Sequence, residues 1–287
     1  MKHITPSALL ISAMALTVAA CSKQDSDAPA AVVAPSPSKA PAATTTVDLS
    51  AETSAYKRWV EGQIDELLAG TQKFVDALAA GQLDEAKRLY APTRMHFERS
   101  EPIAESFGDL DPRIDNREAD LEKDEQWTGF HTIEKILWTR NTTKGTDALA
   151  EQLLKDIKEL RAKIPTAEVT GELMVQGAVD LLNEVSTSKI TGEEEVFSHT
   201  DLYDFKANIE GAEKIFELFT PKLQAKKPEL VAELSEKFTA VNDLLARQRE
   251  GDGYKPYTQL SKDDTKALAE AVNKLGEPLA QMGIILK

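Results

Sequence analysis

From about residue 48 to its end, the chain shows the hydrophobic pattern of amphipathic α-helices. Apolar residues recur every three or four positions, as in the stripe from Tyr56 to Leu78, which places them on one face of a helix. A second stripe follows Gly81 and is expected to continue past Phe97 towards Ala104. It contains Pro92, which lacks a backbone donor and is expected to kink or restart that helix. No segment alternates apolar and polar residues as a half-buried strand does. The pattern predicts an all-α protein.

The remaining helical segments are separated by loops that contain glycine and proline. They are expected at residues 128–138, 146–163 and 166–188, and around the apolar stripes Phe205–Phe219, Leu230–Leu245 and Leu268–Met282. Helices of this number and length predict two four-helix bundles that form a bilobed molecule, because each bundle buries the apolar faces of its members. We expect the N-terminal bundle, with a His-x-x-Glu motif, over residues 48–164 and the C-terminal bundle over residues 165–287.

Residues 1–20 have the features of a bacterial signal peptide. A short polar start with Lys2 precedes a small-residue and apolar run over residues 8–20, which is too short to span a bilayer as a mature helix. The run leads into Val18–Cys21, which resembles a lipobox, the motif whose cysteine becomes the acylated first residue of the mature protein. We therefore expect an exported protein that is anchored to a membrane through the acyl chains on Cys21.

Residues 21–47 are expected to comprise the lipidated cysteine and a disordered linker to the helical part. They are rich in proline, alanine, serine and threonine and have no helical period, so they cannot build a core. Serine rather than aspartate follows the cysteine, which leaves both the inner and the outer membrane open as the place of anchoring. Because Cys21 is the single cysteine, no disulfide within the chain and no thiolate zinc cluster is expected.

The charge of the chain favours a cation over a polyanion as its ligand. The 48 acidic residues outnumber the 34 basic residues and give a formal net charge of −14. Such a surface repels the phosphates of nucleic acids, and no basic stripe offsets the repulsion, so nucleic acid is excluded as a partner. Solubility of an exported protein is a simpler explanation of the same acidity.

The motif with the clearest chemical meaning is His131-x-x-Glu134. On a helix the two side chains leave one face about 5–6 Å apart, so an imidazole nitrogen and a carboxylate can share a cation. The chain has four histidines and many glutamates, so a surface histidine beside a solvated glutamate is the alternative interpretation. The motif also lacks the second histidine of the His-Glu-x-x-His motif of zinc proteases.

Further carboxylates strengthen the hypothesis of a metal site. Glu98 and Glu101 have the same spacing on the preceding helix, and residues 109–118 form a dense acidic segment that includes Asp115 and Glu118. Four-helix bundles commonly build metal sites from inward carboxylates and a Glu/His pair. One histidine among carboxylates favours iron, manganese or zinc over copper(I). A solvated turn is the alternative interpretation of the acidic segment.

Four stretches of the chain resemble the imelysin-like peptidase family. They are residues 90–102, 107–111, 129–135 and 198–205, and the likeness covers about residues 50–287. The resemblance is closest to the EfeO/EfeM branch of periplasmic iron-uptake lipoproteins, in a form without a cupredoxin domain; this branch also includes an alginate-binding cell-surface protein. The resemblance implies a bilobed pair of helical bundles with a metal site at the His-x-x-Glu helix.

Ligands, cargo and partners are implied by the same resemblance. Carried over by position, the metal ligands are His131, Glu134, Glu98, Glu101, Asp115 and, from the second half of the chain, Glu195, with Glu118 as a further candidate. The implied cargo is iron, as Fe3+ or Fe2+, with zinc or another divalent cation as an alternative. The implied role is to bind iron on the periplasmic side or at the cell surface and deliver it to an inner-membrane permease of an Efe-type system, which also contains a haem peroxidase. Such a protein is not an enzyme.

Two other functions stay open. A metallopeptidase of the imelysin type would use the His-x-x-Glu pair as ligands and Glu101 or Glu118 as the base, although no second histidine completes a zinc-protease motif. A surface protein that binds alginate or another acidic polysaccharide would need a local positive patch. The candidate residues for such a patch are Lys222, Lys226 and Lys227, for which solvated loop lysines are the simpler interpretation.

The first testable prediction concerns anchoring. Replacing Cys21 by serine should release or mislocalise the protein without loss of helicity, because the linker separates the acylated residue from the helical part. Membrane fractionation and mass spectrometry of the N-terminal peptide measure anchoring and acylation. Far-UV circular dichroism measures helicity. A Cys21→Ser protein that still partitions with membranes, together with a wild-type protein that carries no acyl group, would contradict the lipoprotein prediction.

Overall fold

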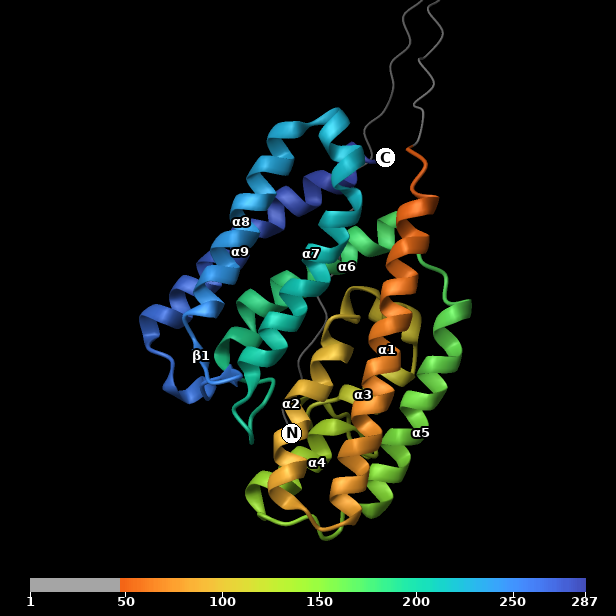
Figure 1. Cartoon of the computed structure of the whole chain (residues 1–287), viewed down its shortest axis with the longest axis vertical. Coiled ribbons are helices and arrows are strands. Elements are labelled where there is room, and N and C mark those ends of the chain that lie inside the picture. Colours follow the sequence, from red (N-terminus) through yellow and green to blue (C-terminus); the bar gives the residue numbers. More distant parts are fainter. Residues whose placement is uncertain (1–46) are drawn as a thin grey trace, which may run out of the picture. The chain divides into compact units, whose positions relative to one another are not determined.

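Helices make up almost all of the regular structure in the computed structural model, which describes residues 47–287 (Figure 1). In this part of the chain the only strands are β1 (Arg249–Glu250) and β2 (Gly253–Tyr254), which pair as a short antiparallel hairpin. The prediction of an all-α protein is therefore confirmed. The signal peptide, Cys21 and the linker up to residue 46 lie outside the described residues. None of the described helices has a stretch that is both long and apolar enough to cross a membrane.

The helices of the first half of the chain pack around α1. The helices are α1 (Ser50–Ala79), α2 (Leu83–Glu98), η1 (Glu101–Phe107), α3 (Leu110–Asp115), η2 (Glu118–Asp120), α4 (Phe130–Thr139), α5 (Asp147–Lys163) and η3 (Ile164–Thr166), where η marks a 3-10 helix. α1 packs against α2 and α5, and α4 contacts both α2 and α5 (Figure 1). The predicted apolar stripe of α1 is buried in this core from Tyr56 to Leu78, as its helical period requires.

The helices of the second half pack around α9. They are α6 (Gly171–Thr187), η4 (Lys189–Thr191), α7 (Asp201–Lys226), α8 (Pro228–Ala246), η5 (Tyr257–Gln259) and α9 (Lys262–Ile285). α9 packs against α6 and α8, and α7 packs against α6 and α8. Two of these helices begin at side-chain caps that satisfy free backbone N–H groups: Thr170 caps α6, and Ser261 forms a capping box with Asp264 at α9.

Helices of the two halves also pack against each other. α7 contacts α2 and α1, and α6 contacts η1. The described residues therefore form a single compact unit. The apolar cores of the two halves are correspondingly joined in one cluster of buried side chains. The division at residue 164 into two lobes stays a prediction.

The two prolines of the second predicted helix have different effects. Pro92 lies inside α2 on its exposed side, and α2 continues across it to Glu98, because the carbonyl group left without a donor can be hydrated. At Pro102 the α-helix has already ended, and the 3-10 helix η1 takes over. The sequence had predicted one continuing helix towards residue 104, so this part of the prediction is wrong.

Two glycines allow the turn between α2 and η1 to approach the second half of the chain. A Cβ on Gly177 of α6 would lie 1.8 Å from the carbonyl oxygen of Pro102, and a Cβ on Gly211 of α7 would lie 2.5 Å from that of Arg99. Both distances are far below a van der Waals contact, so neither position accepts a side chain without movement of the backbone. This close approach places the end of α2 against α6 and α7.

The second prediction compares two glycine substitutions. Gly177→Ala should lower the free energy of unfolding by about 1–3 kcal/mol or more, because the new methyl group forces the two backbones apart. Gly62→Ala, in the exposed middle of α1 with nothing within 4 Å of its Cβ, should raise it by about 0.5–1 kcal/mol through helix propensity. Urea unfolding followed by circular dichroism measures both values. Equal stability of the two variants would contradict the close packing.

Candidate metal centre

Arg94 lies at the centre of the candidate site, although the sequence analysis did not select it. Its side chain is fully buried, and its guanidinium group contacts carboxylates from four parts of the chain. The carboxylates are Glu98 on α2, Asp115 on α3, Glu194 and Glu195 in the segment after η4, and Asp204 on α7. Burial alone would lower the pKa of Arg94, but these carboxylates, with Asp115 the strongest, keep it well above its usual value.

A glycine places His131 next to this cluster. Gly129 precedes α4 with a φ of 88°, a conformation that side chains rarely adopt. A Cβ at this position would lie 2.2 Å from the carbonyl oxygen of Ile114. α4 therefore begins directly against the end of α3, which brings His131 close to Asp115.

The His-x-x-Glu pair is buried rather than exposed. His131 and Glu134 have exposed side-chain fractions of 2% and 1%, and Nδ1 of His131 lies 3.2 Å from Oε2 of Glu134. Burial and Arg94 lower the pKa of His131, but the surrounding carboxylates outweigh them and raise it to about 10. Burial raises the pKa of Glu134, but its bonds to His131 and to the backbone of Ser198 bring it below its usual value. The alternative of a solvated surface pair does not fit this burial.

Lys189 organises the neighbouring pair, Glu98 and Glu101. Its ammonium group is buried and lies 3.1 Å from a carboxylate oxygen of each glutamate. The side-chain amide of Asn208 donates to the same two carboxylates. Burial raises the pKa of Glu101 well above its usual value despite Lys189. The pKa of Glu98 is lowered, because Lys189 and Arg94 outweigh its burial.

Two carboxyl groups next to Arg94 are fully buried and have few hydrogen-bond partners. Asp204 is fully buried, and neither of its oxygens has a hydrogen-bond partner. Glu195 is also fully buried; its Oε1 lies 2.6 Å from Nε of Arg94, and its Oε2 accepts from the hydroxyl of Ser198 at 2.9 Å. Burial, together with the mutual repulsion of the carboxylates, raises the pKa of both groups well above the usual value.

The structure brings together most, but not all, of the residues selected from the sequence. Glu98, Asp115 and Glu195 join the His-x-x-Glu pair around Arg94, and Glu101 lies one step away beside Lys189. Glu118 lines a cavity together with His131 and Glu134, but its half-exposed carboxylate is paired to Lys135. The candidate polysaccharide residues each have a protein neighbour: Lys222 near Glu52, Lys226 at the carbonyl of Ile285, and Lys227 at the amide of Gln281.

The residues that the sequence analysis missed share a recognisable signal. Arg94 lies on the same face of α2 as the buried Tyr90 and Phe97. The missed residues on α7 likewise continue an apolar stripe at helical spacing; they are Asp201, Asp204 and Asn208. A charged or amide side chain inside an apolar stripe needs a partner in the core, and this pattern could have identified them.

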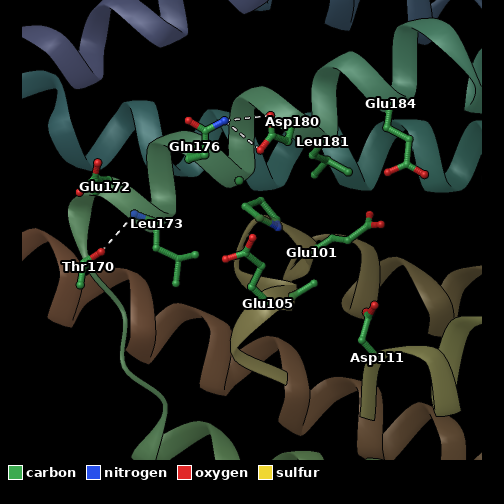
Figure 2. Close-up of a pocket in the computed structure, with 13 residues that line it drawn as sticks. Glu101, Glu105, Asp111, Thr170, Glu172, Leu173, Gln176, Asp180, Leu181 and Glu184 are labelled. Atoms are coloured by element: carbon green, nitrogen blue, oxygen red, sulfur yellow. Dashed lines mark hydrogen bonds between the residues drawn. The ribbon is translucent and has the colours of Figure 1, made fainter. Parts of the chain in front are cut away.

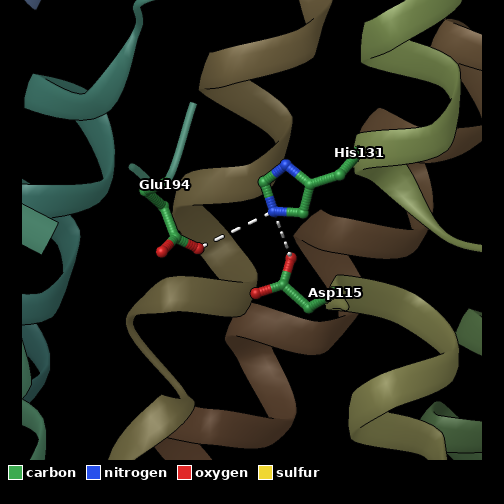
Figure 3. Close-up of side chains that lie close together, drawn as sticks. All are labelled: Asp115, His131 and Glu194. Carbon is green, nitrogen blue, oxygen red and sulfur yellow. Dashed lines mark ion pairs between the residues drawn. The ribbon is translucent and has the colours of Figure 1, made fainter. Parts of the chain in front are cut away.

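Two overlapping groups of side chains have the geometry to hold a cation. One consists of Asp115, His131 and Glu194 (Figure 3), and the other of His131, Glu134 and Glu195. Within each group the potential ligand atoms all lie within 4.8 Å of one another. Both groups offer one imidazole nitrogen and two carboxylate oxygens, a donor set suited to iron, manganese or zinc.

An acidic cavity lies between α6 and η1, next to the candidate metal centre (Figure 2). Its volume is about 520 Å³, and carboxylates line it throughout: Glu101, Glu105, Asp111, Glu172, Asp180 and Glu184. Asp111 is partly buried and lines the cavity near Glu101 and Glu184 (Figure 2). Burial and the negative charge of Asp115 and Glu98 raise the pKa of Asp111 to about 7.

Comparison with known proteins gives a consistent result. Residues 52–282 match the imelysin family. A protein of Staphylococcus haemolyticus with the name Efem/EfeO family lipoprotein is 53% identical over 241 residues, which cover 83% of this chain and 84% of the relative. A protein of Staphylococcus aureus with the same name is 49% identical over 243 residues, which cover 83% of this chain and 86% of the relative.

The third prediction uses the pH dependence of stability. The pKa of Asp111 is about 7 in the folded protein and about 3.8 as the unperturbed value. As the pH rises from 4 to 7, the unfolded chain therefore loses this proton before the folded protein does, which lowers the stability of the wild type. Asp111→Asn should thus gain stability relative to the wild type across this range, by about 1 kcal/mol after allowance for partial solvation, and the gain should stay constant above pH 7.

Urea unfolding at several pH values in the presence of a chelator measures this difference. Asp109→Asn is the matched control, because it makes the same substitution in the same segment at a carboxylate that is 78% exposed and pairs with Arg113. If Asp111→Asn parallels the wild type between pH 4 and 8, the assignment of a raised pKa to Asp111 is wrong.

Proposed function

The chain belongs to the imelysin family, and from this membership and the buried histidine–carboxylate cluster we propose that it binds a metal ion, iron, outside the cytoplasm and delivers it to a membrane permease. The observation that carries the proposal is the environment of His131. Three carboxylates from three parts of the chain approach this buried imidazole: Glu134 at 3.2 Å, Asp115 at 3.6 Å and Glu194 at 3.7 Å. Side chains of this kind and spacing suit a single cation.

The charges around the centre support a cation as the ligand. Glu101, Glu195 and Asp204 all have pKa values well above usual, because burial and neighbouring carboxylates disfavour their ionised forms. Carboxyl groups retain their protons for this reason where too few cationic side chains lie nearby to balance the negative charge. A bound cation would supply that charge in place of the protons.

The donor set supports a hard or borderline metal as cargo. The candidate ligand atoms are carboxylate oxygens and one imidazole nitrogen, which suit iron in either oxidation state, and zinc or another divalent cation as alternatives. A larger share of carboxylates favours the more highly charged Fe3+. Elemental analysis of the protein purified from its own cell envelope would identify the metal.

Lipid anchoring is part of the proposal. The two relatives are named as lipoproteins, and Val18–Cys21 of this chain has the pattern of a lipobox. The acyl chains on Cys21 would hold the metal centre close to the membrane, on the periplasmic side or at the cell surface. The proposed partners are an inner-membrane iron permease and a haem peroxidase of an Efe-type system.

The side chains around the centre favour binding over catalysis. A peptidase would need a free base near the metal, but Glu101 is bound by Lys189 and Asn208, and Glu118 is paired with Lys135. The three candidate polysaccharide lysines have protein neighbours of their own, as described above. The metal-binding function is therefore better supported than a metallopeptidase or a polysaccharide-binding function.

The fourth prediction tests the metal centre. His131→Ala should weaken the binding of iron by about 100-fold or more, because it removes the one nitrogen ligand that both candidate groups share, while helicity should change little. His96→Ala is the matched control, since His96 is only partly buried and contacts Gln63 and Arg99 instead. Equilibrium dialysis of the full-length protein with Fe2+ under nitrogen and with Fe3+ citrate measures the affinities. Equal affinity of His131→Ala and the wild type would contradict the proposed site.

A further inference from the structure

An apolar groove lies at the end of the molecule where the described chain begins. Its volume is about 490 Å³, and its walls come from the residues before α1, the first half of α6 and the end of α9. Most of its side chains are apolar: Val47, Leu49, Val175, Val179, Ala280, Ile284 and Leu286. Figure 1 shows the start of α1 and the C-terminus together at this end. The groove shares no residue with the cavities that border His131 or Glu194, so it is separate from the candidate metal centre.

Close packing between these elements holds the walls of the groove. A Cβ on Gly171, the first residue of α6, would lie 2.5 Å from Cδ1 of Leu49, and a Cβ on Gly283 of α9 would lie 3.0 Å from Cγ1 of Val175. The side chains of Leu49 and Val175 therefore occupy the space next to each glycine. These contacts make the groove part of the packed helical structure.

Ile284 extends the apolar surface of the groove into solvent. It is 73% exposed, and among the described residues the other large hydrophobic residue that is exposed is Val196, at 49%. A single exposed apolar side chain is common on protein surfaces. Ile284, however, adjoins six further apolar side chains that line the same groove. A contiguous apolar surface of this kind marks a place where another apolar surface binds.

Lysines surround the same end of the molecule. The ammonium group of Lys226 donates to the carbonyl oxygen of Ile285 at 3.0 Å, and that of Lys227 donates to a side-chain amide oxygen of α9 at 3.1 Å. Both acceptors are neutral, so they do not cancel the charge of the lysines. Lys287 lines the groove and is 71% exposed, with Glu172 at 3.4 Å. This end of a chain with a net charge of −14 therefore presents positive charge beside its apolar groove.

The sequence connects this end of the molecule to the lipid anchor. Only the 25 residues from 22 to 46 separate Cys21 from Val47, and a chain of that length spans at most about 85 Å. Because Val47 itself lines the groove, acyl chains on Cys21 would keep the groove within this distance of the bilayer. Tethering raises the effective concentration for a second contact to roughly the millimolar range, so even a weak contact with the lipid surface becomes populated.

We propose that the apolar groove docks on the surface of the bilayer that holds the lipid anchor. Ile284 and its apolar neighbours contact the boundary between headgroups and acyl chains, where apolar side chains are stabilised because they leave water. Lys226 and Lys227 face anionic headgroups, whose surface potential attracts them without displacing their hydrogen bonds. This inference rests on the lipid anchoring in the proposed function and does not depend on which metal is bound.

A second copy of the chain fits the groove less well than a bilayer does. A symmetric dimer through this face would bring the same lysines of both copies together, and like charges placed side by side oppose association. An anionic lipid surface has the opposite charge and requires no such approach. The positive charge beside the groove therefore favours lipid as the occupant.

Docking through this end would also orient the molecule. α1 begins beside the groove and has 30 residues, so it extends about 45 Å away from it (Figure 1). The loop that contains Lys144 lies near the far end of α1, because Thr143 is the nearest neighbour of Gly81 in the turn that follows α1. Residues at the two ends of α1 should therefore differ in their distance from the lipid.

A fluorescent label at the groove tests docking in the full-length, lipidated protein. Ala280→Cys places the label on an exposed residue that lines the groove, and Lys144→Cys places a matched label at the far end of α1. Each protein is reconstituted in vesicles of phosphatidylethanolamine and phosphatidylglycerol, with and without nitroxide-labelled lipid. We expect the nitroxide lipid to quench the label at position 280 and to leave the label at position 144 unchanged. The wild type, whose single cysteine is Cys21, controls for nonspecific labelling.

Substitutions beside the label test which side chains contact the lipid. The quenched fraction of the label at position 280 gives the ratio of docked to undocked molecules. Ile284→Glu should lower this ratio about tenfold or more, because it removes an apolar contact and adds a charge that anionic lipids repel. Val196→Glu is the matched control, since it adds the same charge at the other exposed aliphatic residue, and it should leave the ratio unchanged.

The lysines are tested by the charge of the lipid. Lys226→Gln and Lys227→Gln should each lower the ratio of docked to undocked molecules about fivefold in the anionic vesicles. The same substitutions should have a much smaller effect in vesicles of phosphatidylcholine, which carry no net charge. Circular dichroism of each variant shows whether its helices remain folded.

Iodide, a quencher that stays in water, distinguishes the other possible surroundings of the groove. Quenching of the label at position 280 by iodide and not by the nitroxide lipid would mean that the groove faces water. Protection from both quenchers would mean that the chain itself or a second copy covers the groove, and disulfide cross-linking of two Ala280→Cys molecules would identify the second copy. Each of these results overturns the docking on the bilayer.

The inference and the proposed function fail in different ways. If the wild type carries no lipid and does not bind vesicles, the anchoring in the proposed function is contradicted, and the docking falls with it. If the wild type is anchored but the label at position 280 is not quenched by the nitroxide lipid, this inference alone is overturned. Neither result bears on metal binding, which His131→Ala tests separately.

Discussion

The burial of the Arg94 guanidinium among carboxylates is the interaction on which the rest of the centre depends. Arg94 contacts side chains from α2, α3, α7 and the segment after η4, so it joins elements that lie far apart in the sequence. Removing one partner from a buried ion pair typically costs about 3–5 kcal/mol, because the other charge stays buried without compensation. The surrounding helices must therefore form together, and the arginine holds the carboxylates in place.

Close backbone packing makes this arrangement sterically accessible. Gly177 and Gly211 allow the end of α2 and the start of η1 to lie against α6 and α7, and Gly129 allows α4 to begin against α3. Each contact brings polar side chains of one element within reach of another. The small residues around the site thus determine how close its charged residues come.

The centre has more acidic groups than its own cations can neutralise. Arg94 and Lys189 supply permanent positive charge inside the protein, yet Glu195 and Asp204 have strongly raised pKa values and Asp204 has no hydrogen-bond partner. An apolar core of the same shape would avoid this cost. Such unsatisfied groups are commonly found where a protein binds a charged ligand, which connects the electrostatics of the fold to the proposed binding of a cation.

The sequence by itself determined the helical class, the buried stripe of α1 and the His-x-x-Glu pair, because these depend on periodicity within one segment. It also pointed to Glu98, Asp115 and Glu195, through a family resemblance. The tertiary structure alone decided that Arg94 and Asp204 belong to the same centre, that Glu118 pairs with Lys135 instead, and which nitrogen of His131 is left without a partner. Spacing along a helix specifies the neighbours on its own face, whereas contacts between α2, α4 and α7 depend on how the helices pack, which no local pattern encodes.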